Sequence, residues 1–192
     1  MKIRLALGLA ATLTLAACGS SSSSDSNTSA PAVENSASAA GFNDADVMFA
    51  QMMIPHHEQA IEMSDMALDP STQASKTVSD LATQIKAAQD PEIKEMKDLL
   101  AAWGQPLTAE MDHSSDMDGM LSMDDMQKLG SLKGTDFDYF WAQSMIAHHE
   151  GAIDMAEVVL ADGSNAEALA HANAIVSAQA TEIDILKTIP KP

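Results

Sequence analysis

Apolar side chains recur at intervals of three and four residues from about residue 43 to the end of the chain. This spacing places them on one face of an α-helix, and such a face is buried against neighbouring helices. No window alternates apolar and polar residues as a half-buried strand does. The pattern therefore predicts an all-α domain over residues 43–190.

Helix-capping residues and helix breakers divide this domain into four helices. The predicted spans are 43–69, 72–103, 135–162 and 164–189. Three of the four starts are marked by a capping residue with an acidic residue three positions later, as in a capping box. These pairs are Asn43 with Asp46, Thr135 with Asp138, and Ser164 with Glu167.

The first two helices and the last two are copies of one hairpin. A shift of 92 residues places the segment MIPHHEQAI, residues 53–61, on MIAHHEGAI, residues 145–153. A shift of 90 residues places AQDPEI, residues 88–93, on AQATEI, residues 178–183. A single hairpin cannot bury its apolar faces alone, so the two copies are expected to form a four-helix bundle. A long crossover rich in Met and Asp, residues 105–134, would join them.

Histidines interrupt the apolar stripes at matching positions of the two copies. His57 lies on the stripe of Met53, one helical turn later, and is predicted to face the core. His56 lies about 100° around the helix from it, which predicts a position on the flank of the stripe. The second copy repeats the arrangement with Met145, His148 and His149. His57 and His149 are therefore the better candidates for a buried site.

Glutamates occupy the middle of the core stripes of the second and fourth helices, at Glu92 and Glu182. An unpaired carboxylate is expensive to bury, so each needs a partner, and the histidines together with Gln89 and Gln179 are available. Two interpretations stay open from this pattern. The polar residues form a metal site, or they form a structural His–Glu–Gln network in a protein that binds no metal.

The N-terminal 42 residues are expected to lie outside the folded domain. Residues 1–17 combine a basic start with a short apolar run, which is typical of a signal peptide. The run ends in the sequence LAAC, which resembles a bacterial lipoprotein signal and predicts lipidation of Cys18. Residues 18–42 are rich in Ser and Ala and predict a flexible tether. The protein is thus predicted to be anchored in the cell envelope, on the periplasmic face of the outer membrane or the outer face of the cell membrane.

The formal charge of −18 disfavours nucleic acid as a partner, because phosphate binding needs clustered Lys and Arg. The same negative charge disfavours adsorption to an anionic membrane surface, so the N-terminal lipid is the only expected contact with a membrane. An acidic protein does raise the local concentration of cations. The expected partner is therefore a metal ion, with a copper-transfer partner of unknown identity.

The residue types favour copper, and Cu(I) in particular, as the cofactor. Cys18 is the chain's only cysteine, so soft ligands must come from methionine and histidine, a combination that suits Cu(I) better than zinc. A di-iron enzyme of the ferritin-like kind would need Glu-x-x-His motifs on core helices. The only such motif, Glu110 to His113, lies in the crossover. A redox enzyme therefore stays a lesser alternative, and no catalytic residues are predicted.

The crossover reads MDHSSDMDGMLSMDDM over residues 111–126 and supports two interpretations. Its methionines either bind metal as accessory ligands or fill gaps at the end of the core. The accessory candidates, including two residues from the helices, are Met52, His113, Met117, Met120, Met123 and His171.

The paired M-I-x-H-H-x-x-A-I segments, the A-Q-x-x-E-I segments and Gly119-Met120-Leu121 resemble a bacterial family of unknown function that includes CopM-like copper-binding proteins. The resemblance spans residues 43–187 and implies an extracytoplasmic, ferritin-like four-helix protein with copper binding or copper tolerance as its role. The predicted function is to bind Cu(I) and to buffer it or pass it on. It implies these residues as metal ligands: Met53, His56, His57, Met145, His148 and His149.

Overall fold

A computed structural model describes residues 41–108 and 117–192 of the chain. The predicted signal peptide, Cys18 and most of the tether lie outside the described residues, as does His113. None of the described helices is long and apolar enough to cross a membrane.

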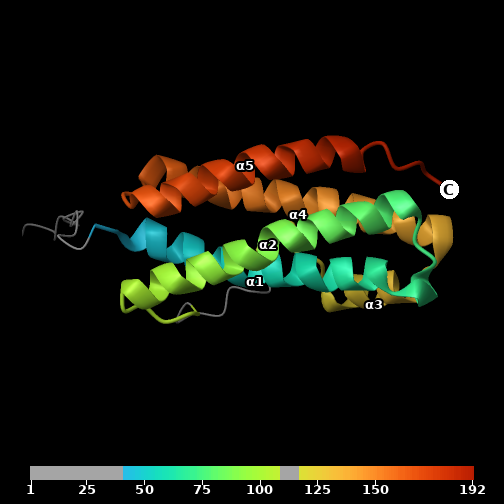
Figure 1. The fold of residues 1–192 in the computed structure, drawn as a ribbon, viewed down its shortest axis with the longest axis horizontal. Helices are drawn as coiled ribbons and strands as arrows, with labels where there is room; N and C mark the ends of the chain where they lie inside the picture. Colours follow the sequence, from blue (N-terminus) through green and yellow to red (C-terminus); the bar gives the residue numbers. More distant parts are fainter. Residues whose placement is uncertain (1–40, 109–116) are drawn as a thin grey trace, which may run out of the picture. The chain divides into compact units, whose positions relative to one another are not determined.

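Four long helices form the domain, and Figure 1 shows them packed in two antiparallel hairpins. They are α1 (Asp44–Leu68), α2 (Lys76–Ala102), α4 (Gly134–Asp162) and α5 (Ala166–Leu186). The hairpins α1–α2 and α4–α5 meet mainly where α1 packs on α4. The predicted all-α bundle of two repeated hairpins is therefore confirmed, with two short helices added: η1 (Pro70–Thr72) and α3 (Met123–Ser131).

The helix starts agree with the capping prediction in one case and differ in the others. Asn43 and Asp46 form the predicted capping box at α1. The helix α4 begins one residue before Thr135 without a side-chain cap, and α5 is capped by Asn165 instead of Ser164. These two predictions failed because Asp138 and the hydroxyl of Ser164 bind residues of the other hairpin instead of capping their own helices.

Two buried aspartates join the hairpins, one at each end of the bundle. The carboxylate of Asp46, on α1, accepts hydrogen bonds from the backbone N–H groups of Ser164 and Asn165 at 3.1–3.2 Å. The carboxylate of Asp138, on α4, accepts one from the backbone N–H of Ser75 at 3.0 Å. Asp46 and Asp138 are 92 residues apart, so the repeat uses one position twice. Each aspartate holds the start of the second helix of the opposite hairpin.

Substituting Asp46 by alanine should destabilise the fold by about 2–3 kcal/mol, because it leaves several buried N–H donors without an acceptor. Asp46 is fully buried, whereas Asp44 in the same helical turn is exposed and supplies the matched control. Urea unfolding followed by circular dichroism measures the difference, and the Asp44→Ala change should stay within about 0.5 kcal/mol. Equal stability of the two variants would contradict the role assigned to Asp46.

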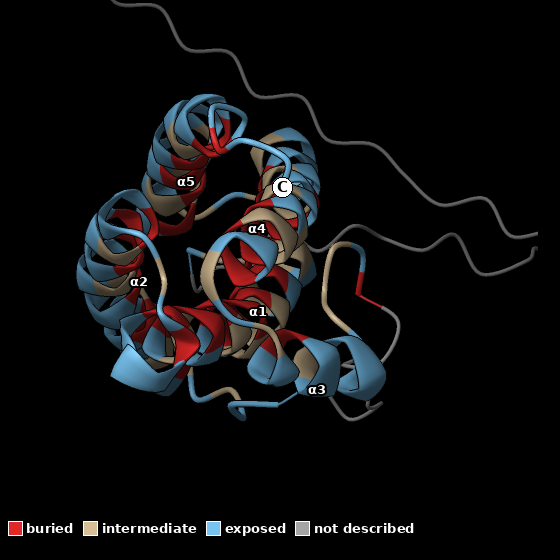
Figure 2. Cartoon of the chain, turned by 90° about the vertical axis from the view of Figure 1, so that its right-hand side faces the viewer, coloured by how far each residue is buried: buried red, intermediate tan, exposed pale blue. Residues whose placement is uncertain are grey.

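The core is divided into two apolar clusters, and Figure 2 shows the buried residues lining the interior between the helices. One cluster surrounds Trp141, whose indole N–H donates to the carbonyl of Met63 at 3.0 Å. The other cluster surrounds Phe49 and Ile175. Along α1 and along α4, the histidines lie between the residues of one cluster and the residues of the other. A polar layer therefore separates two apolar halves of the core.

Candidate metal centre

All four histidines of the repeat are fully buried. His56 and His148 lie on the flanks of their helices, as predicted, yet both have no exposed surface, so His57 and His149 are not the better buried candidates. Their rings stack with centroids 3.8 Å apart and planes at 43°. The flank of α1 and the flank of α4 are the surfaces on which these helices pack against each other. The stripe pattern of a single helix cannot reveal that its flank has a partner.

The two stripe histidines each bind the stripe glutamate of their own hairpin. Nε2 of His57 lies 2.9 Å from Glu92 Oε2, and Nε2 of His149 lies 2.7 Å from Glu182 Oε2. The glutamates are at the margin of the layer, with 20% and 16% of their side chains exposed. The sequence offered histidines and glutamines as partners of these carboxylates, and the partners are the histidines. A carboxylate only accepts hydrogen bonds, so the neutral form of each imidazole carries its proton on Nε2 and a lone pair on Nδ1.

Nδ1 of every one of the four histidines is buried and has no hydrogen-bond partner among the described residues. His56 shares the pattern of the stripe pair, because its Nε2 lies 3.3 Å from the backbone carbonyl of Asp118. His148 has neither ring nitrogen paired within the same part of the chain. Buried nitrogens are nearly always paired in folded proteins. Five unpaired imidazole nitrogens in one layer, the four Nδ1 atoms and Nε2 of His148, therefore require an explanation beyond packing.

The amides of Gln89 and Gln179 do not complete a network. Both atoms of the Gln89 amide and Oε1 of Gln179 are buried without a partner in the described residues. The predicted His–Glu–Gln network is thus present only in its His–Glu half. A partly satisfied polar network is less stable than an apolar core would be, so packing alone does not account for these residues.

Burial keeps the central pair of histidines neutral. Desolvation, with repulsion from His57, lowers the pKa of His56 from 6.5 to about 3. Desolvation, with repulsion from His56, lowers the pKa of His148 well below its usual value. A neutral imidazole is the form that binds metal ions. The central pair, His56 and His148, is therefore in the form that binds metal ions at neutral pH.

Two methionines flank the histidine layer. Met53 and Met145 are fully buried, as predicted, and belong to the two different apolar clusters. Each lies one turn before a stripe histidine on the same helix face. Each copy of the repeat thus supplies one thioether and one unpaired imidazole nitrogen from a single helix face.

A short loop, residues 117–121, lies over the histidine layer and is called the strap below. The side chain of Gln59 holds it with two hydrogen bonds, donating to the carbonyl of Leu121 at 3.0 Å and accepting from its N–H at 2.8 Å. On α4 the strap lies against Gly151, where a Cβ would meet the carbonyl oxygen of Asp118 at 2.0 Å.

Gln59 and Gly151 are equivalent positions of the repeat, 92 residues apart, and sequence reasoning missed both. A glycine in the middle of a helix was the available signal for Gly151.

The accessory candidates among the described residues do not gather at one place. Met117 is buried in the strap, and Met120 lines a hollow between the strap, α3 and α4. Met123 is 88% exposed on α3. His171 contacts Glu95 at 3.4 Å in a separate groove between α2 and α5. Met52 is half-buried on α1, one turn before His56.

The described residues contain no group of three His, Cys, Asp or Glu side chains that could hold a metal ion. A metal ion in the histidine layer would therefore need thioether ligands or a low coordination number. Glu92 and Glu182 each bind a different histidine, which is unlike the clustered carboxylates of a di-iron centre.

A profile of the family described as domain of unknown function DUF305 matches residues 46–189. The chain belongs to this family. DUF305 proteins of known structure share the fold. The protein from Streptomyces coelicolor, whose name describes it as secreted, has 30% identity and a TM-score of 0.69, with 74% of this chain and 88% of that chain covered. A DUF305 fragment from Deinococcus radiodurans has 29% identity and a TM-score of 0.68, covering 76% and 94%.

The similar structures also include CopM in its Cu(I)-bound form, with 31% identity and a TM-score of 0.62 over 74% of this chain and 92% of CopM. CopM structures are also known in Cu(II)-bound and silver-bound forms. No curated protein matches the sequence. The predicted resemblance to a CopM-like DUF305 family is therefore confirmed.

Proposed function

We propose that this DUF305 protein binds Cu(I) in its histidine layer and buffers or transfers the ion outside the cytoplasm. The observation that carries the proposal is the set of four buried Nδ1 atoms without partners, beside two buried thioethers. Metal-bound CopM structures support it at 31% identity. The secreted Streptomyces relative supports the location, and the sequence of the N-terminus adds a lipid anchor at Cys18.

Each copy of the repeat would contribute a thioether and an imidazole to the ion. In the first copy these are Met53 and Nδ1 of His57, and Glu92 would hold the imidazole proton on Nε2. A carboxylate on the far nitrogen fixes the orientation of a ligating histidine and raises its basicity. His149, Glu182 and Met145 would do the same in the second copy. Glu92 and Glu182 are then positioning residues, in place of the direct ligands that the stripe pattern suggested.

The residue types select a soft ion. Thioether sulfur and imidazole together suit Cu(I), whereas zinc and iron sites in proteins draw on thiolate, carboxylate or more histidines. The net charge of −18 adds a long-range attraction for any cation. The cluster offers no reacting group beyond metal ligands, so the proposal is a binding role instead of an enzyme activity.

Competition titration of the purified protein with Cu(I) and a chromophoric chelator tests the proposal. We expect tight binding to the unmodified protein and a loss of about 10–100-fold in affinity in the Glu92→Gln, Glu182→Gln variant, the range typical of partners of metal ligands. The Glu95→Gln variant removes a carboxylate from a surface His–Glu pair and should bind like the unmodified protein. Binding of Cu(I) no tighter than that of a methionine-free acidic protein would contradict the proposal.

A further inference from the structure

Three residues of α1 connect the protein surface with the histidine layer. Met48, Met52 and His56 follow one another at intervals of four residues, so they lie on one face of the helix, about 6 Å apart along its axis. Met48 is 56% exposed, Met52 is half-buried and His56 is fully buried. The two thioethers therefore form a path from solvent to a buried imidazole.

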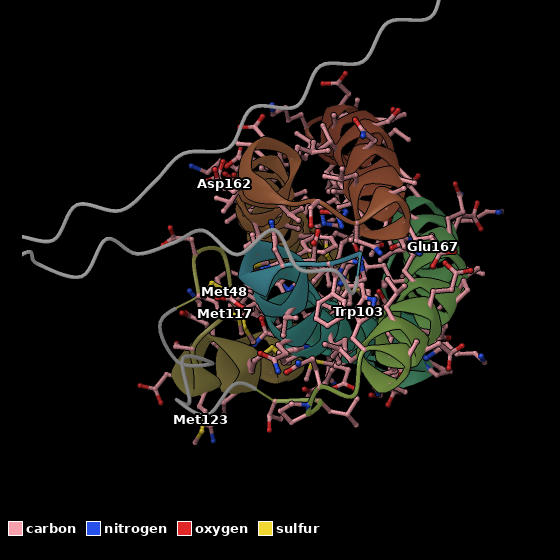
Figure 3. The ribbon with its side chains drawn as sticks, turned by 90° about the vertical axis from the view of Figure 1, so that its left-hand side faces the viewer. Met48, Trp103, Met117, Met123, Asp162 and Glu167 are labelled. Carbon is pink, nitrogen blue, oxygen red and sulfur yellow. The ribbon has the colours of Figure 1, made fainter. Side chains whose placement is uncertain are left out.

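The strap adds a third thioether to this path. Asp118 contacts His56, and Leu121 contacts Gln59. In both pairs the strap residue lies beside the α1 residue that stands 62 positions earlier, so the strap runs along α1 in the same direction. Met117 precedes Asp118 and thus lies toward the Met52 end of the helix. Its side chain belongs to neither apolar cluster, yet only 7% of the residue is exposed. Figure 3 looks along the bundle and shows Met48 and Met117 on the same side of α1.

The repeat shows that helix packing does not require these sulfur atoms. The positions equivalent to Met48 and Met52 in the second copy are Phe140 and Ser144. The histidine that follows them, His148, is buried as fully as His56. The thioethers are thus a property of one copy only, the copy whose histidine ring lies 3.3 Å from a strap carbonyl.

We propose that Met48, Met52 and Met117 form an uptake site for a soft monovalent cation, Cu(I) or Ag(I), from which the ion passes to His56. This inference rests on the proposed function, because it concerns the route to the histidine layer. Thioethers bind soft monovalent ions and have little affinity for Mg²⁺ or Ca²⁺. The ion moves by ligand exchange, from sulfur to the unpaired Nδ1 of the imidazole, with no change in its oxidation state.

Leucine substitutions separate an uptake site from the histidine layer, because leucine conserves the volume of methionine and removes its sulfur. The test uses the full chain with Met48→Leu, Met52→Leu and Met117→Leu combined, and Met123→Leu on α3 as the exposed control. Stopped-flow transfer of Cu(I) from a chelator measures uptake, and competition titration measures affinity at equilibrium. Titration with Ag(I) of protein carrying ¹³C-labelled methionine methyl groups identifies the sulfurs that bind first.

Uptake by the triple variant should be about tenfold slower, within the range by which substitutions change association rates. Its affinity at equilibrium should stay within about threefold of the unmodified protein, because loss of the path slows uptake and release together and leaves the ratio of the two rates nearly unchanged. The methyl signals of Met48, Met52 and Met117 should shift at the lowest Ag(I) concentrations.

Unchanged uptake, or unchanged methyl signals, would overturn the uptake site and leave the histidine layer as the binding site. A large loss of affinity at equilibrium would also overturn it, by making the three sulfurs part of the final site. Absence of Cu(I) binding to the unmodified protein would instead contradict the proposed function itself.

Discussion

Replacing His57 and His149 together by alanine is expected to lower the affinity for Cu(I) by more than about 100-fold. Removing a residue that only hydrogen-bonds a metal ligand lowers affinity by about 10–100-fold, and removing the ligand itself should cost more. Both imidazoles are fully buried, and each presents an unpaired Nδ1 to the layer. Their loss removes one nitrogen ligand from each copy of the repeat. Competition titration with Cu(I) measures the effect.

The control for this double variant is His171→Ala, which removes a histidine from a His–Glu pair on the surface. This variant should bind Cu(I) like the unmodified protein, because His171 lines a groove that contains none of the four buried histidines. Full affinity in the His57→Ala, His149→Ala variant would place the metal in the methionine-rich crossover instead. Each substitution leaves a glutamate at the margin of the layer, Glu92 or Glu182, without its histidine partner, which destabilises the fold. Circular dichroism therefore checks that any loss of binding does not come from unfolding.

Mild acid is expected to destabilise the metal-free protein by about 3 kcal/mol for each pH unit below about 6.5. The pKa of His56 is about 3 and that of His148 lies well below its usual value of 6.5. Between these values the unfolded chain binds two protons that the folded protein does not. Stability is therefore complete above about pH 6.5 and falls as the pH decreases. Urea unfolding at pH 7, 6 and 5 measures the slope.

The His148→Leu variant checks the origin of this slope. One of the two protons is then absent, so the free energy of unfolding should change about half as steeply with pH. At pH 7 the variant should be at least as stable as the unmodified protein, because a buried imidazole without a hydrogen-bond partner costs about 1–3 kcal/mol. An unchanged slope would contradict the assignment of the acid response to the buried pair.

The neutral and unpaired state of His148 is more easily understood as a requirement of function than of folding. Natural proteins retain destabilising residues where a site needs them. A leucine at this position would improve the core and remove two unpaired ring nitrogens from the layer. Measuring stability and Cu(I) affinity on the same variant therefore separates the two roles of the residue.

Local sequence patterns were sufficient for the parts of the fold that depend on one helix. The spacing of Met53 and His57 predicted a buried thioether and imidazole, and both are buried. The position of Glu92 on the core stripe of the second helix indicated that it needs a polar partner, and this partner is His57, at 2.9 Å. These predictions succeed because helix periodicity alone decides which side chains share a face.

Contacts across the bundle could not be predicted in this way. Asp138 has the spacing of a capping residue, yet it binds Ser75 on the other hairpin, because the ends of α2 and α4 meet there. The strap and its partner Gln59 also bring together segments 62 residues apart, for which the sequence carries no periodic signal. Only the packing of helices decides which of several polar partners is within reach.

The sequence by itself determined the duplicated hairpin, the core stripes of its helices and the histidines, methionines and glutamates that lie on them. The tertiary structure decided how His56 and His148 are placed. Each lies on the flank of its own helix, and the pair becomes buried only because α1 and α4 pack flank to flank, with the two rings 3.8 Å apart. Burial in turn lowers the pKa of both imidazoles, since the charged form loses its hydration. The chemistry of the layer thus follows from helix packing, which a single helix's pattern does not encode.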